Sequence, residues 1–167
     1  MRTDEMVGRV GMRLVVLVMT LLLGPGAAVA QDLSALARLV PEQSWVSDHR
    51  GAVDMELALS QPVPWRVRVL DAPPRLVLDT REVDWTGLAS VDQESTAVLD
   101  MRAGMVRQGW SRLVMELSGP FLVAQADMRT GEAGAKVRLR LISASAEEFA
   151  AAAALPEPAG WALPEVA

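Results

Sequence analysis

The stretch that decides the fold is "PPRLVLDTREVDW", residues 73–85, and part of it recurs as "GWSRLVMELSGP", residues 109–120. In both stretches leucine or methionine occupies every second position of the central run, a pattern typical of a half-buried β-strand. The positions between them form an Arg-Val-acid row on the opposite face. These outward-facing residues are Arg75, Val77 and Asp79 in the first stretch and Arg112, Val114 and Glu116 in the second. We therefore predict two strands of the same amphipathic design.

Further strands are predicted on either side of these two. Alternating apolar residues mark the segments 52–60, 65–71 and 135–143, and the segments 98–103 and 121–129 are further strand candidates between turn residues. The turn "DAPP" closes the segment 65–79 into a hairpin. Short strands between frequent turn residues predict an all-β fold, a sandwich of two roughly symmetric antiparallel sheets. The two β-rich halves share an Arg-Leu-Val strand, at 75–77 and at 112–114, so the match is interpreted either as a sign of two related sheets or as chance.

Residues 1–30 differ from the rest and are predicted to be a cleavable signal peptide. Arg13 precedes an uncharged apolar run, 14–23, and the small residues Ala28 and Ala30 mark a cleavage site. A membrane anchor is the alternative, but the run is shorter than the ~20 residues that span a bilayer. The mature chain is therefore expected in the periplasm, with no stable membrane span.

The segments around the β domain are short. Residues 31–44 form a lead-in that a proline interrupts, and residues 45–142 form one β-sandwich domain. Ser145 stands three residues before Glu148, which is a capping box that predicts a short C-terminal helix over 143–155. Residues 156–167 are rich in proline and are expected to be a linker.

Charge and composition limit the partners of the 167-residue chain. Its formal net charge is −5, whereas phosphate binding needs a net basic surface, so nucleic acid is not an expected partner. There is no cysteine, so an exported domain of this kind has to be stabilised by packing alone.

The two Arg-Val-acid rows have two explanations. One is a solvated sheet face on which charges pair across strands, each pair contributing at most about 1 kcal/mol. The other is a ligand surface on which arginine forks bind carboxylates or sugar hydroxyls beside valine. Core packing is the default role of the tryptophans, but Trp110, which follows a glycine and stands beside Arg112, is the best candidate for an exposed one.

Catalytic residues are scarce. A catalytic zinc site needs about three protein ligands, and the chain has a single histidine, His49. A serine nucleophile would need the same histidine. Asp79 with Glu82 or Asp84 could serve as paired carboxylates, but "DTREVD" is more simply a charged loop. We therefore expect no enzymatic activity, no metal and no other cofactor in this chain.

The order of these segments resembles a known family. A signal peptide, "LSQPVPWRVRVLDAPPRLVLDTREVDWTG", "MRAGMVRQGWSRLVMELSGP" and an alanine-rich helix are similar to the AMIN domain. This domain precedes the catalytic domain of periplasmic N-acetylmuramoyl-L-alanine amidases, and the resemblance to the alphaproteobacterial type covers about residues 45–142. It implies two packed, roughly symmetric β-sheets with motifs on their outer faces.

The resemblance also implies a function. AMIN domains bind peptidoglycan and direct amidases to the division site during cell separation, so peptidoglycan is the expected partner, with division-site or amidase-activator proteins as further partners. The outer-face residues of the two motif strands, with Trp110, are then the expected contacts with the cell wall. The zinc of such amidases belongs to a catalytic domain for which this sequence has no counterpart. Alternatives are a truncated fragment of the amidase itself or the AMIN-type module of an outer-membrane secretin.

Overall fold

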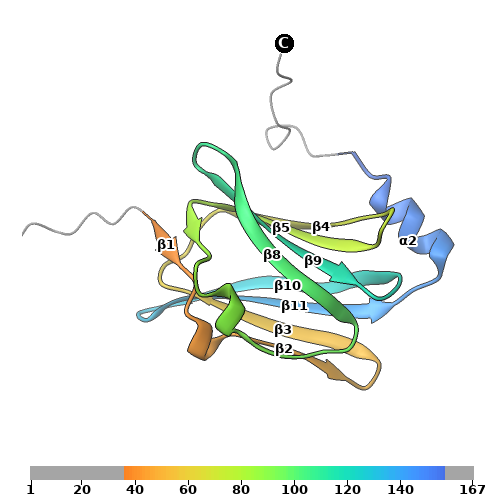
Figure 1. Ribbon diagram of the computed structural model, residues 1–167, viewed down its shortest axis with the longest axis horizontal. Coiled ribbons are helices and arrows are strands. Elements are labelled where there is room, and N and C mark those ends of the chain that lie inside the picture. The colour runs from red at the N-terminus through yellow and green to blue at the C-terminus, as the bar shows by residue number, and fades with distance from the viewer. Residues whose placement is uncertain (1–35, 157–167) are drawn as a thin grey trace, which may run out of the picture. The chain divides into compact units, whose positions relative to one another are not determined.

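The computed structural model describes residues 36–156, and most of these residues lie in β-strands. Figure 1 shows two sheets facing each other, with one short helix at the C-terminal end. The predicted all-β sandwich with a C-terminal helix is therefore confirmed. The predicted signal peptide, 1–30, and all but the first residue of the predicted linker, 156–167, lie outside the described residues.

The strands and helices follow one another in a simple order. They are β1 (Ala37–Arg38), the 3-10 helix η1 (Pro41–Gln43), β2 (Trp45–His49), β3 (Ala52–Leu59), β4 (Trp65–Leu70), β5 (Arg75–Arg81), β6 (Val83–Asp84), the 3-10 helix η2 (Leu88–Ser90), β7 (Asp92–Glu94), β8 (Val98–Arg107), β9 (Trp110–Leu117), β10 (Phe121–Gly131), β11 (Gly134–Ser143) and the helix α2 (Ala146–Ala153).

The two main sheets differ in size and make-up. One has five strands in the order β10-β11-β3-β2-β7, and the other has four in the order β4-β5-β9-β8. The strands β1 and β6 form a third, two-stranded sheet. Pairing within the main sheets is antiparallel except between β2 and β7. The four-stranded sheet is therefore a simple antiparallel unit, closed at one side by the predicted β4–β5 hairpin.

The interpretation of two related sheets required one Arg-Leu-Val strand in each sheet, and the structure does not have this arrangement. The segments at 75–77 and 112–114 both lie in the four-stranded sheet, where β5 and β9 are antiparallel neighbours. Arg75 faces Glu116, Val77 faces Val114, and Asp79 faces Arg112. An Arg-x-Val-x-acid sequence run antiparallel to its own copy places each arginine opposite an acid. The repeat therefore makes two neighbouring strands complementary.

The core lies between the two main sheets. It is built from the alternate apolar positions of each strand, and the largest fully buried side chains include Leu76, Leu78, Leu113 and Met115 from one sheet and Met55, Leu57 and Leu141 from the other. Each such burial contributes about 1.5–3 kcal/mol. Because the chain has no cysteine, this packing is the principal source of its stability.

Segments outside the main sheets close the sides of the core. Val83 and Trp85 are buried in it, so the loop "TREVDWTG" folds back onto the core. Residues 36–44, expected to be lead-in, also belong to the folded unit, since Ala37 and Leu39 are buried and β1 pairs in parallel with β6. A two-residue strand is too short to show a side-chain periodicity. Its position is set by the strand with which it pairs.

Helix α2 covers the side of the sandwich near β4 and β10 (Figure 1). The predicted capping box is present, because the Ser145 hydroxyl accepts a hydrogen bond from the Glu148 backbone N–H and the Glu148 carboxylate accepts one from the Ser145 N–H. Phe149, which is 2% exposed, attaches the helix to the core. None of the helices within residues 36–156 has the length and apolar character needed to cross a bilayer.

Candidate functional site

The outer face of the four-stranded sheet is the most distinctive surface of the described chain. Strand alternation and register place on it the outward residues of β4, β5, β9 and β8, and we call these residues the arginine face. Its arginines are Arg66, Arg68, Arg75, Arg81, Arg102, Arg107 and Arg112, and its acids are Asp79, Asp100 and Glu116. A chain with a net charge of −5 thus carries one face on which cations clearly outnumber anions.

Asp79 lies at the centre of the arginine face and is only 3% exposed. Arg66 donates from Nε at 2.8 Å, and Arg112 donates from Nε at 2.6 Å and from Nη2 at 3.1 Å. Burial raises the pKa of the Asp79 carboxyl, but the hydrogen bonds and charges of Arg112 and Arg66 outweigh it and hold the pKa below its ordinary value. Asp79 is therefore an anion at neutral pH, and it orients two arginines.

The other predicted contacts have different surroundings. Val77 is 1% exposed, whereas Val114 and Glu116 are partly exposed in the same sheet. Arg75 donates to the carbonyl oxygens of Pro73 at 3.1 Å and of Asp71 at 3.3 Å, which holds the β4–β5 turn. Of the seven predicted site residues, Val77 and Asp79 thus offer a ligand almost no surface. The ligand-accessible part of the face is made by the arginines around them.

Trp110 lies at one end of the arginine face and is half-buried. Its ring is flanked by two guanidinium groups, with Arg81 at 5.5 Å and Arg107 at 5.2 Å from the ring centroid. Both distances are within the range of cation–π contacts. The indole therefore supports cations instead of presenting a bare ring on which a sugar could stack.

Several arginines of this face were absent from the predicted site. Arg66 and Arg68 alternate outward on a predicted strand, so that signal was present in the sequence. Arg81 and Arg107 lie beyond the predicted ends of their strands, at 79 and 103, because polar residues continue β5 and β8 through pairing with β9. Only the register of three strands brings these two side chains to Trp110.

The outer face of the five-stranded sheet has balanced charges. Glu56 accepts hydrogen bonds from Lys136 at 2.6 Å and Arg138 at 2.7 Å, and Arg140 pairs with Asp54 at 3.1 Å. Burial raises the pKa of Glu56, but these two cations outweigh it and lower the pKa below its ordinary value. Cations and anions alternate across these strands, so this face has less to offer an anionic ligand.

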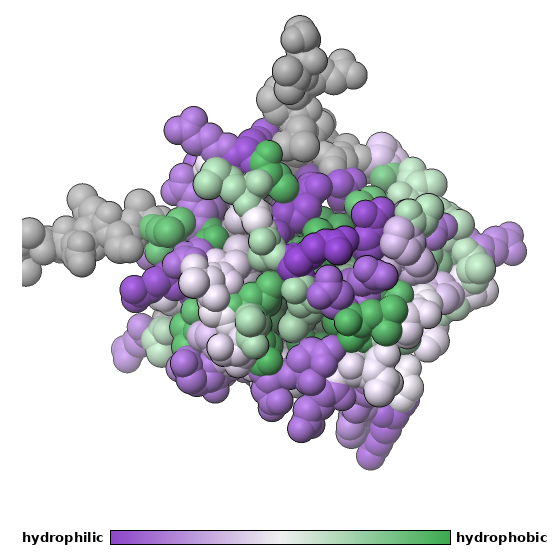
Figure 2. All heavy atoms as spheres, viewed as in Figure 1, coloured by the Kyte–Doolittle hydropathy of each residue, from purple (hydrophilic) through white to green (hydrophobic). Residues whose placement is uncertain are grey.

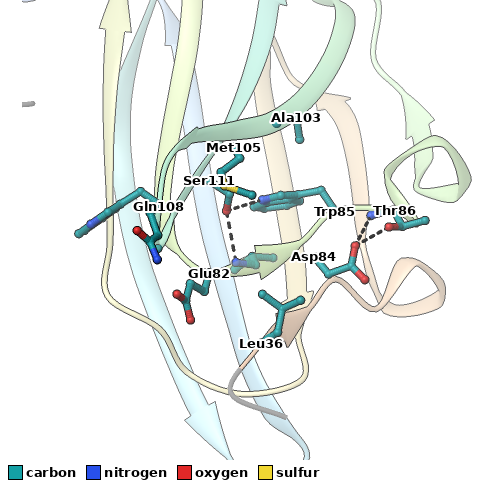
Figure 3. Close-up of a pocket in the computed structure, with 13 residues that line it drawn as sticks. Leu36, Glu82, Asp84, Trp85, Thr86, Ala103, Met105, Gln108 and Ser111 are labelled. Carbon is teal, nitrogen blue, oxygen red and sulfur yellow. Dashed lines mark hydrogen bonds between the residues drawn. The ribbon is translucent and has the colours of Figure 1, made fainter. Parts of the chain in front are cut away.

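Seen from the side of β8, hydrophilic and hydrophobic side chains are interspersed over the surface (Figure 2). The exposed hydrophobic residues include Leu36, Leu99, Met105 and Val106. Leu36 and Met105 line a cavity of about 580 Å³ that lies between β6 and the ends of β8 and β9. Figure 3 shows Ser111 and Trp85 side by side in its wall.

Ser111 holds the wall of this cavity together. Its Oγ accepts a hydrogen bond from Trp85 Nε1 at 3.0 Å and from the Val83 backbone N–H at 3.3 Å, and it is 2.9 Å from Thr80 Oγ1. The one histidine of the chain, His49, lies on β2 in the other sheet. The arrangement around Ser111 is that of a structural hydrogen-bonding centre.

Replacing Ser111→Ala should lower the free energy of unfolding by about 1–3 kcal/mol, because it leaves the buried Trp85 N–H and Val83 N–H without an acceptor. Urea denaturation followed by tryptophan fluorescence measures this change. Ser143→Ala is the control, since Ser143 is exposed and its hydroxyl donates a long hydrogen bond, 3.5 Å, to the Gly51 carbonyl oxygen. Equal stability of the two variants would contradict the structural role of Ser111.

Metal-ligating residues are dispersed in the described chain. No group of three or more histidine, aspartate or glutamate side chains within residues 36–156 is placed to hold a metal ion. The acids considered above as paired carboxylates have different surroundings. Asp79 lies under the arginines, whereas Glu82 and Asp84 border the cavity of Figure 3.

Comparison with known proteins adds no family to this description. No protein-family model matches the chain, and no curated protein matches it in sequence. What the structure defines is an all-β sandwich with an arginine-rich outer face.

Proposed function

We propose that this chain is a non-catalytic, periplasmic module that binds peptidoglycan and localises a cell-wall N-acetylmuramoyl-L-alanine amidase during cell separation. The arginine face is the observation that carries this proposal. Peptidoglycan is a polymer of amino sugars and short peptides, rich in hydroxyl, amide and carboxylate groups. Planar guanidinium forks on a rigid sheet are suited to bind such groups through many separate hydrogen bonds.

The resemblance of the two motif strands to AMIN domains supports the same conclusion. Those strands, β5 and β9, are the two central strands of the four-stranded sheet. Their outward residues therefore lie in the middle of the arginine face, which is where the resemblance expects a wall-binding motif. Division-site or amidase-activator proteins are further partners that the proposal implies.

Cosedimentation with purified, insoluble murein sacculi tests the proposal with the full exported chain. Wild-type protein should pellet with sacculi, and Arg75→Gln combined with Arg102→Gln should weaken the apparent affinity at least about tenfold, since each lost charge-assisted hydrogen bond contributes about 1.5–3 kcal/mol. Neither arginine bonds to the buried Asp79, and the bonds of Arg75 to the turn carbonyls are exposed, so the variant should lose no more than about 1.5 kcal/mol of its free energy of unfolding.

The matched control removes two positive charges from outside the arginine face. Arg50→Gln combined with Arg129→Gln takes two exposed cations from outside the arginine face and should pellet like the wild type. Wild-type protein that stays in the supernatant, or a control as defective as the arginine-face variant, would overturn the proposal.

A further inference from the structure

Arg81, Trp110 and Arg107 form one row across β5, β9 and β8. The register pairs Arg81 with Trp110 and Trp110 with Arg107. A bulge in β8 between Met105 and Arg107 turns the arginine to the outer face beside the ring. The two guanidinium groups thus reach the same indole from strands on either side of it, at 5.5 and 5.2 Å from its centroid.

These two arginines differ from Arg66, Arg75, Arg102 and Arg112 in what engages them. Arg66 and Arg112 bond to Asp79, Arg75 bonds to turn carbonyls, and Arg102 lies 3.5 Å from Asp100. Within residues 36–156, no ion pair joins Arg81 or Arg107 to a carboxylate. Among the same residues, the buried Nε of Arg107 has no hydrogen-bond acceptor.

The nearest acid along the chain does not neutralise the row. Glu82 follows Arg81 directly, but it has a positive φ of 31° and lines the cavity on the inner side of the sheet with Gln108 (Figure 3). Trp110 also lines this cavity, but within residues 36–156 no ion pair joins Glu82 to Arg81 or Arg107. The end of the arginine face at Trp110 keeps its positive charge.

A guanidinium held against an aromatic ring is prepared to bind a carboxylate. Contact with the ring uses the flat face of the group and leaves its N–H edge to donate two parallel hydrogen bonds to a pair of carboxylate oxygens. Because the ring already restricts the arginine side chain, less conformational entropy is lost on binding. A sugar hydroxyl, a single neutral acceptor, would use only part of this geometry.

We propose that Arg81 and Arg107, supported by Trp110, form a carboxylate receptor, so that the module recognises the carboxylate-bearing peptides of the cell wall and not its sugar backbone. This inference rests on the proposed function and names the part of the polymer that is bound. Trp110 acts as a positioning residue that holds the two arginines, and the arginines contact the ligand.

The experiment compares three preparations of sacculi with the full exported chain. One is intact, one has its carboxyl groups converted to amides with carbodiimide and ammonium, and one has its peptides removed by an amidase. The lactyl carboxylates that this hydrolysis leaves on the glycan are then converted to amides in the same way. Wild-type protein should bind intact sacculi and lose at least about tenfold in apparent affinity for the other two. Binding to amidated or peptide-free sacculi that equals binding to intact sacculi would overturn the carboxylate receptor while leaving wall binding in place.

Variants test the same receptor from the protein side. Arg81→Lys combined with Arg107→Lys keeps the charge but removes the planar fork, and it should weaken binding to intact sacculi about tenfold. The variant with Arg50→Gln and Arg129→Gln should bind normally although it has lost two charges. Unchanged binding by a folded lysine variant would overturn the role of the forks, and failure of wild-type protein to bind any sacculi would instead overturn the proposed function.

Discussion

Replacing Asp79→Ala should destabilise the fold by about 3–5 kcal/mol, because it removes the shared partner of two partly buried arginines. The Asp79 carboxylate is 3% exposed and receives hydrogen bonds from Arg66 and Arg112 at 2.6–3.1 Å. A loss of this size is a large fraction of the ~5–15 kcal/mol that stabilises a typical domain. Thermal denaturation followed by circular dichroism measures it.

Asp100→Ala is the matched control on the same face. Asp100 is exposed and lies 3.5 Å from Arg102, so its removal should change the free energy of unfolding by less than about 1 kcal/mol. If both variants lost the same stability, the arginines would not depend on a buried anion, and the central position of Asp79 would have no structural role.

Acid should weaken the wild-type fold for the same reason. The folded-state pKa values of Asp79 and Glu56 are lowered by their cationic partners, so the unfolded chain takes up protons first as the pH falls. Their stabilising contribution is complete above about pH 5 and is lost as the pH falls below the unfolded pKa values of about 4 towards the lower folded ones. Unfolding midpoints measured from pH 6 to pH 2 should therefore fall less steeply for Asp79→Asn than for the wild type.

Alternation alone is enough to predict most strands of this chain and the two faces of each. Leu76, Leu78, Leu113 and Met115 are all fully buried, as their period-two spacing predicts. Side-chain alternation is local, which is why it can be read from one segment at a time. The capping box at Ser145 is equally local, and it is present in the structure.

Strand pairing is not local, and this is where the sequence was insufficient. Nothing within either Arg-Leu-Val segment shows whether it faces its copy across the core or lies beside it in one sheet. The structure pairs Asp79 with Arg112 in neighbouring strands, which buries an acid that alternation had placed on the surface. The same register creates the row at Trp110, because Arg81 and Arg107 are 26 residues apart in sequence and meet only through β9.

A second position that should tolerate little change lies in the β10–β11 hairpin of the five-stranded sheet. Gly134→Ala should cost about 2–5 kcal/mol, combining backbone strain with a steric clash. Gly134 has a φ of +122°, and a Cβ added there would lie far inside van der Waals contact with the carbonyl oxygen of Leu59 and 3.0 Å from the carbonyl carbon of Ser60. Both neighbours are backbone atoms at the end of β3, so they cannot rotate away as a side chain could.

Gly131→Ala in the same hairpin separates this clash from the general cost of replacing glycine. Gly131 pairs with Gly134 across the turn, but a Cβ there meets nothing within 4 Å and its φ is not positive. Its substitution should change the free energy of unfolding by no more than about 0.5 kcal/mol. Urea denaturation of both variants gives the comparison.

Because β11 pairs with β3 from Ala135 onward, a folded Gly134→Ala protein with wild-type stability would mean that these two strands can move apart at this end of the five-stranded sheet. A tight β3–β11 junction predicts instead that only Gly131→Ala keeps the wild-type midpoint.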